Sequence, residues 1–78
     1  MATIEQIKAA RALLEWSQED LAARAKLSII TVRRFESRSK ERVSDEARLK
    51  MEAALEATGI VFTNGNEPGV RLRKRGKK

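Results

Sequence analysis

The chain lacks cysteine and histidine, and its 78 residues include only two Phe and one Trp as aromatic residues. Without Cys, no disulfide framework or thiolate metal site supports the fold. Without His, Cys/His zinc sites and imidazole acid–base chemistry are excluded. A chain this short buries only about 60–65% of the surface that its unfolded form exposes, so its core must be compact. With so few aromatic residues, a roomy pocket that tunes carboxylates is not expected. We therefore expect neither an enzyme nor a bound cofactor or metal.

Acidic residues are in the minority, with 11 Asp and Glu against 17 Lys and Arg, which gives a formal net charge of +6. Such a basic domain is expected to bind a polyanion, either nucleic acid or an anionic membrane surface. No apolar run approaches the ~20 residues that cross a bilayer. The first residues also lack the basic and apolar regions of a signal peptide. We expect a cytoplasmic protein with no membrane segment.

Apolar periodicity and helix-start signals predict helices at about residues 4–15, 18–25, 29–37 and 45–58. Thr3 and Gln6 have the spacing of a capping box, and Ser17 and Ser44 precede acidic first turns. Gly59 stands where a left-handed residue ends a helix.

Two short β-branched or alternating runs, residues 60–63 and 70–73, flank a turn-rich loop and predict a hairpin. The predicted fold is mainly α, a single domain over residues 1–73 with four helices and a short C-terminal β-hairpin. Residues 74–78 are predicted to be a basic disordered tail. The apolar face that Val70 and Leu72 share requires cover, from the domain's own helices or from a second protomer.

The second and third predicted helices are separated by Lys26 and Leu27 alone, because Ser28 already caps the third helix. A connection this short cannot place the two helices antiparallel, so it forces them to cross at a sharp angle. This is the geometry of a helix-turn-helix, whose second helix enters the DNA major groove.

A helical wheel of the third helix places Val32 and Phe35 toward the core. Ile30 and Arg34 then lie almost opposite, and Ile29 falls at the border. An outward isoleucine fits contact with the thymine methyl group, and the arginine fork matches O6 and N7 of guanine. The alternatives are that Ile30 belongs to a plain surface or a protein interface, that Ile29 closes the core, and that Arg34 is merely solvated.

Phosphate contacts are expected at the start of the second helix, in the third helix and in the charged loop after it. The residues concerned are Ser17, Gln18, Thr31, Arg33, Arg38, Lys40 and Arg42. An ordinary charged surface is the alternative. Residues 70–78 hold six basic residues and no acid, which suits either sequence-independent affinity or solubility.

Residues 12–25 resemble the opening of Cro/CI-type helix-turn-helix proteins, also called XRE-family regulators. The pattern continues in Leu27, Ser28, Thr31, Val32, Phe35 and Glu36. Residues 59–62 and 68–73 also resemble the C-terminal segments of short bacterial members of this family. The resemblance implies a lambda-repressor-like fold. The sequence departs from the family pattern at Glu15, Lys26 and Arg38, where the family often has glycine.

By that resemblance, Gln18 contacts DNA, and Thr31 and Arg33 match flanking or phosphate positions. The positions that match groove-facing residues are Ser28, Ile29, Ile30 and Arg34. The expected function is a sequence-specific regulator of transcription, a repressor or autoregulatory controller that binds a two-half-site operator as a homodimer, with residues 60–73 as one candidate interface. The alternatives are an antitoxin-type module that binds a partner protein as well as DNA, and a sequence-indifferent nucleic-acid binder.

Overall fold

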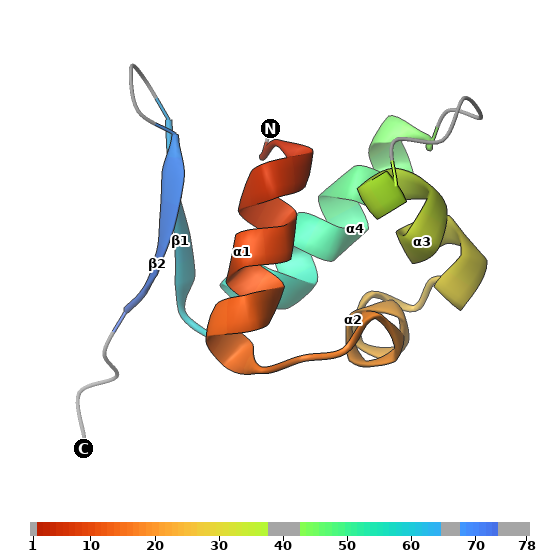
Figure 1. The fold of residues 1–78 in the computed structure, drawn as a ribbon, viewed down its shortest axis with the longest axis horizontal. Helices are drawn as coiled ribbons and strands as arrows, with labels where there is room; N and C mark the ends of the chain where they lie inside the picture. Colours follow the sequence, from red (N-terminus) through yellow and green to blue (C-terminus); the bar gives the residue numbers. More distant parts are fainter. Residues whose placement is uncertain (1, 38–42, 65–67, 74–78) are drawn as a thin grey trace.

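The computed structural model describes residues 2–37, 43–64 and 68–73 (Figure 1). These residues form four helices followed by one antiparallel hairpin. The elements are α1 (Ile4–Leu14), α2 (Gln18–Ala25), α3 (Ile29–Ser37), α4 (Asp45–Glu56), β1 (Ile60–Thr63) and β2 (Gly69–Leu72). The predicted class, mainly helical with a C-terminal hairpin, is confirmed. In the described ranges no helix is long and apolar enough to cross a membrane.

The helices begin at the predicted side-chain caps. The Thr3 hydroxyl accepts a hydrogen bond from the Gln6 backbone N–H at 3.1 Å, and the Gln6 side-chain oxygen accepts one from the Thr3 N–H at 2.8 Å. Ser17 and Asp20 form the same reciprocal pair at 3.0 and 2.9 Å, and Ser44 caps α4. Each cap supplies an acceptor to backbone donors that have none inside the helix.

Two predicted boundaries differ from the structure at the C-terminal end. α4 ends two residues before the predicted position, because Thr58 donates both its backbone N–H and its hydroxyl to the Leu55 carbonyl and tightens the last turn. Gly59, at φ +105°, then turns the chain into β1 as predicted. β2 begins and ends one residue earlier than predicted, since Gly69 already pairs with Thr63.

One small core lies between the helices and the hairpin. Its largest fully buried side chains are Ile7, Leu21, Val32, Met51 and Leu55. Burial of each stabilises the fold by about 1.5–3 kcal/mol. Phe35 is only 4% exposed, so the helical-wheel assignment of Val32 and Phe35 to the core is confirmed.

The hairpin packs its apolar face on the helices of its own chain. Ile60 is buried, and Phe62 and Val70 are partly buried against the core, with β2 beside α1 and β1 beside α4. The buried Gln6 amide donates to the carbonyls of Thr63 and Gly69 at 2.8 and 2.9 Å, which ties the loop end of the hairpin to the first turn of α1. The domain's own helices therefore cover Ile60, Phe62 and Val70, whereas Leu72 on the same face is 46% exposed.

Among the described residues, two other than glycine adopt the left-handed conformation. Glu15, at φ 57° and ψ 36°, ends α1 one residue before the predicted boundary. Lys26, at φ 58° and ψ 46°, ends α2. This conformation brings Cβ close to the following carbonyl oxygen and costs an L-residue roughly 1–2 kcal/mol. The turn after α1 and the turn between α2 and α3 are thus both strained.

Replacement of Lys26 by glycine is expected to raise the free energy of unfolding by about 1 kcal/mol, because glycine adopts positive φ without the Cβ clash. Chemical denaturation measures the change. Ala23→Gly is the matched control on the exposed side of α2, where glycine costs about 1 kcal/mol. Equal destabilisation by both substitutions would show that the Lys26 turn carries no strain.

Candidate nucleic-acid interface

A tight turn joins α2 to α3. After Lys26, the Leu27 backbone N–H donates to the Ala22 carbonyl at 2.9 Å, which closes the end of α2. The Ser28 hydroxyl accepts a hydrogen bond from the Thr31 backbone N–H at 3.1 Å and caps α3. Helices α2 and α3 pack against each other, so the turn fixes the position of α3 on the body of the domain.

The two faces of α3 differ sharply in exposure. Val32, Phe35 and Glu36 are buried, whereas Ile30 is 53% exposed. Ile29 is partly buried and packs against the core. Of the two isoleucines, only Ile30 therefore stands on the outer face, and Ile29 closes the edge of the core. The other outward residues of this helix are Arg33, Arg34 and Ser37.

A buried carboxylate lies beneath this outer face. The Glu36 side chain, 3% exposed, accepts hydrogen bonds from Arg11 Nε at 2.9 Å and from Arg11 Nη2 at 2.7 Å. It also accepts one from the Gln18 side-chain amide at 3.0 Å. Arg11 Nη1 donates to the Trp16 carbonyl at 2.9 Å. One carboxylate thus connects α1, the α1–α2 connection, the start of α2 and the end of α3.

The sequence prediction missed this network. It predicted no contact for Arg11 and included Glu36 as a position of the family pattern. A usable signal was present, because Glu36 lies four residues after Val32 and follows Phe35, at the edge of the buried face of α3. Arg11 is 25 positions away in sequence, so no local pattern indicates that it is the partner.

The surroundings of Glu36 act on its pKa in opposite directions. Burial raises the pKa of this carboxyl, since it disfavours the charged form. The hydrogen bonds from Arg11 and Gln18, together with the charges of Arg11 and Lys8, outweigh burial and hold the pKa below its ordinary value of 4.5. The carboxylate is therefore charged in the folded protein at neutral pH.

Several of the predicted DNA-contacting residues lie around one open hollow above this carboxylate. α1 and α2 contribute Lys8, Arg11 and Gln18, and the α3 side consists of Ile30, Arg33, Arg34, Glu36 and Ser37. Cationic and apolar side chains therefore meet on one surface, and Gln18 is held there by its bond to Glu36.

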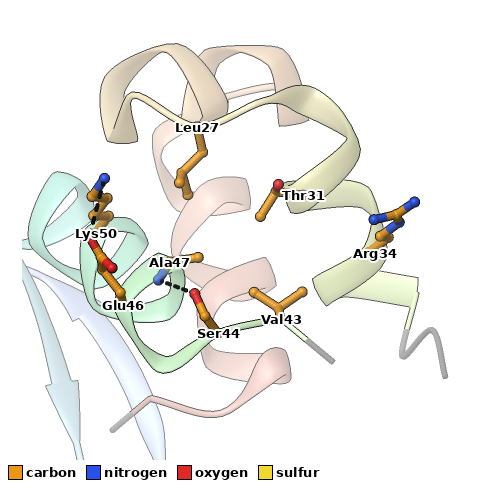
Figure 2. Close-up of a pocket in the computed structure, with 8 residues that line it drawn as sticks. All are labelled: Leu27, Thr31, Arg34, Val43, Ser44, Glu46, Ala47 and Lys50. Atoms are coloured by element: carbon orange, nitrogen blue, oxygen red, sulfur yellow. Dashed lines mark hydrogen bonds and ion pairs between the residues drawn. The ribbon is translucent and has the colours of Figure 1, made fainter. Parts of the chain in front are cut away.

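A second hollow lies on the other side of α3, between this helix and the start of α4 (Figure 2). Leu27, Thr31 and Val43 face into it, and the Arg34 guanidinium points away from it. The hydroxyl groups of Thr31 and Ser28 are hydrogen-bonded to each other at 3.0 Å. Thr31 therefore lies at the edge of the outer face of α3 rather than at its centre.

The start of α2 differs in detail from the predicted anion site. The Ser17 backbone N–H donates to the Asp20 carboxylate, and its hydroxyl accepts from the Asp20 N–H. The first-turn N–H groups of Gln18 and Glu19 have no acceptor within the helix. Arg38, Lys40 and Arg42, also predicted to bind phosphate, lie outside the described residues.

No protein-family model matches the chain, and no curated protein is significantly similar to it in sequence. The resemblance to Cro/CI-type regulators therefore stays a prediction. What the described structure adds is the geometry of the outer face of α3 and of its support by Glu36.

Glu36→Gln is expected to lower the free energy of unfolding at pH 7 by about 3 kcal/mol, because the substitution leaves the partly buried Arg11 without a counter-charge. A carboxyl with a depressed folded pKa stabilises the fold above its unfolded pKa, and this stability is lost as the pH falls through the folded pKa. The difference between wild type and variant should therefore shrink as the pH drops below 4.5. Denaturant unfolding at several pH values measures it.

Glu46→Gln is the matched control for that experiment. Glu46 is 80% exposed and lies 3.8 Å from Lys50, so the substitution should cost at most about 1 kcal/mol. A pH-independent difference between wild type and Glu36→Gln would contradict the role of the buried carboxylate.

The two isoleucines of α3 should respond differently to truncation. Ile30→Ala is expected to change the free energy of unfolding by less than about 0.5 kcal/mol, because the side chain is largely exposed. Ile29→Ala should cost more, about 1 kcal/mol or above, since this side chain is partly buried against the core. Thermal or denaturant unfolding distinguishes them, and a larger loss at Ile30 would refute the assigned faces.

Proposed function

We propose that the chain is a sequence-specific double-stranded DNA-binding regulator of transcription with a lambda-repressor-like fold. The observation that carries this proposal is the outer face of α3, where the half-exposed Ile30 stands beside Arg33 and Arg34, directly after a tight turn. Because more than half of the Ile30 side chain is exposed, its burial contributes little to the stability of the free protein. Contact with DNA gives that apolar surface a partner.

The proposed contact begins with α3 in the major groove, which is about 12 Å wide and admits one helix. Ile30, near the start of α3, packs on a thymine methyl group. Arg34 lies one helical turn further and presents its guanidinium to O6 and N7 of guanine. Specificity in this mechanism depends on these two side chains, and Ser28 and Ile29 flank them.

Backbone contacts fix the position of the helix on the duplex. Gln18 is held by Glu36 at the start of α2, beside the first-turn N–H groups, and supplies a neutral donor to a phosphate. Arg33 lies one position before Arg34 and contacts the flanking phosphate. The net charge of +6 adds attraction that depends on salt but not on sequence.

The regulator is proposed to act in the cytoplasm as a homodimer on two half-sites about 10–10.5 bp apart, as a repressor or an autoregulatory controller. The antitoxin-type alternative assigns residues 60–73 to a partner protein. That alternative has less support, because Ile60, Phe62 and Val70 already pack against the helices of their own chain.

Selection of bound duplexes from a random pool, repeated at rising salt, tests the proposal. A specific regulator retains a preferred site after the electrostatic binding of other sequences has been screened. If no sequence is enriched at any salt concentration, the chain is a sequence-indifferent binder and the proposal fails.

Arg34→Ala is expected to weaken binding to the selected site by about 1–3 kcal/mol and to relax the preference at one base position. The physical reason is the loss of a bidentate contact to one guanine. Arg24→Ala is the matched control, because Arg24 stacks on Trp16 at 4.8 Å and belongs to α2. An equal loss on all duplexes would reassign Arg34 to phosphate binding.

A further inference from the structure

The outer face of the hairpin carries arginines. Arg71 pairs with Val61 across the sheet, and successive side chains of a strand alternate between its faces. Because Val70 lies on the core-facing side, Arg71 and Arg73 lie on the opposite side. Both are exposed, and neither makes an ion pair in the part of the chain that the structure describes.

This face points away from the proposed α3 interface. Figure 1 shows the hairpin at one end of the longest axis of the molecule and α3 toward the other end, with all four helices on one side of the hairpin. That axis extends 41 Å. The helices therefore separate the hairpin arginines from the hollow that Ile30 and Arg34 line.

The charged residues at the C-terminal end of the sequence all have one sign. From Val70 onward the sequence contains no acidic residue, and it continues after Arg73 with Lys74, Arg75, Lys77 and Lys78. Glu56 lines a hollow together with Arg73, although no ion pair joins them in the described structure. Arg71 and Arg73 are spaced about 6.8 Å apart along the strand, which suits contact with successive phosphates of a nucleic-acid backbone.

We propose that the arginine face of the hairpin, formed by Arg71 on β2 and Arg73 directly after this strand, is a second binding surface for duplex DNA. It holds the phosphate backbone of a segment other than the one that α3 contacts, so the protein bridges two duplex segments. The guanidinium fork pairs with phosphate oxygens in two parallel hydrogen bonds, and this contact requires no base sequence. The bridging of two duplexes rests on the DNA-binding function proposed for α3. Binding of DNA by the hairpin arginines does not.

Capture of a second duplex tests the proposal. An unlabelled duplex is immobilised and loaded with the full chain, and a fluorescent duplex of unrelated sequence is then added. The double variant Arg71→Gln/Arg73→Gln should capture at least about tenfold less of the fluorescent duplex than wild type, because two phosphate contacts are lost. Arg24→Gln/Lys50→Gln is the matched control, since it removes the same charge from exposed positions on α2 and α4.

Salt dependence gives a second readout that does not need bridging. In a background that carries Arg34→Ala, binding to a random duplex is measured between low and moderate salt. Loss of both hairpin arginines should reduce the slope of log K against log salt by about 2, or about 0.9 for each phosphate contact. The control pair should change this slope by less than half as much.

Each outcome decides between the proposals. If α3 selects no site, yet the hairpin variant still reduces the salt slope, the function proposed for α3 fails and the second surface stands. The second surface is overturned if the hairpin double variant captures as much fluorescent duplex as wild type, or if the control variant loses as much capture as the hairpin variant. Sedimentation must show the same oligomeric state for variant and wild type, because a changed state would assign the arginines to self-association. Equal weakening of binding to polyglutamate or to anionic vesicles would overturn the assignment to DNA.

Discussion

The structure depends most on one buried carboxylate, that of Glu36. Burial alone makes its charge unfavourable, yet Arg11 and Gln18 surround it with three N–H donors at 2.7–3.0 Å. A guanidinium fork accepts a carboxylate only in a narrow range of orientations, so this contact fixes direction as well as distance. A small core of aliphatic side chains tolerates sliding of one helix over another more readily, because hydrophobic burial is not directional.

The strained turn after α1 belongs to the same arrangement. Glu15 adopts the left-handed conformation, and the next residue, Trp16, presents its carbonyl to Arg11 at 2.9 Å. The guanidinium that holds Glu36 therefore also holds the connection into α2. The cost of positive φ at Glu15 is offset by a charge-assisted hydrogen bond. The start of α2, which carries Gln18, and the outer face of α3 are consequently oriented by one set of contacts.

Local signals in the sequence predicted most of the fold, and non-local contacts account for what was missed. Thr3, Ser17 and Ser44 mark helix starts because a cap acts within three residues, and Val32 and Phe35 follow the period of one helix. The pairing of Arg11 with Glu36 spans 25 positions, and the bond from Gln6 to the hairpin spans 57. Periodicity contains no information about such partners. The outward Ile30 was predictable, whereas the half-buried Ile29 depended on packing.

Buried and exposed charges perform different tasks in this chain. The Arg11–Glu36 pair is largely withdrawn from water and therefore little screened by salt, so it serves orientation. The arginines on α3 and on β2 are exposed, and between such charges and a phosphate backbone the attraction falls steeply with ionic strength. Preference for one sequence consequently requires a contact that salt does not remove. In the proposed function, the apolar Ile30 on the described surface of α3 supplies this contact, and the buried Arg11–Glu36 pair helps to hold α3 in place.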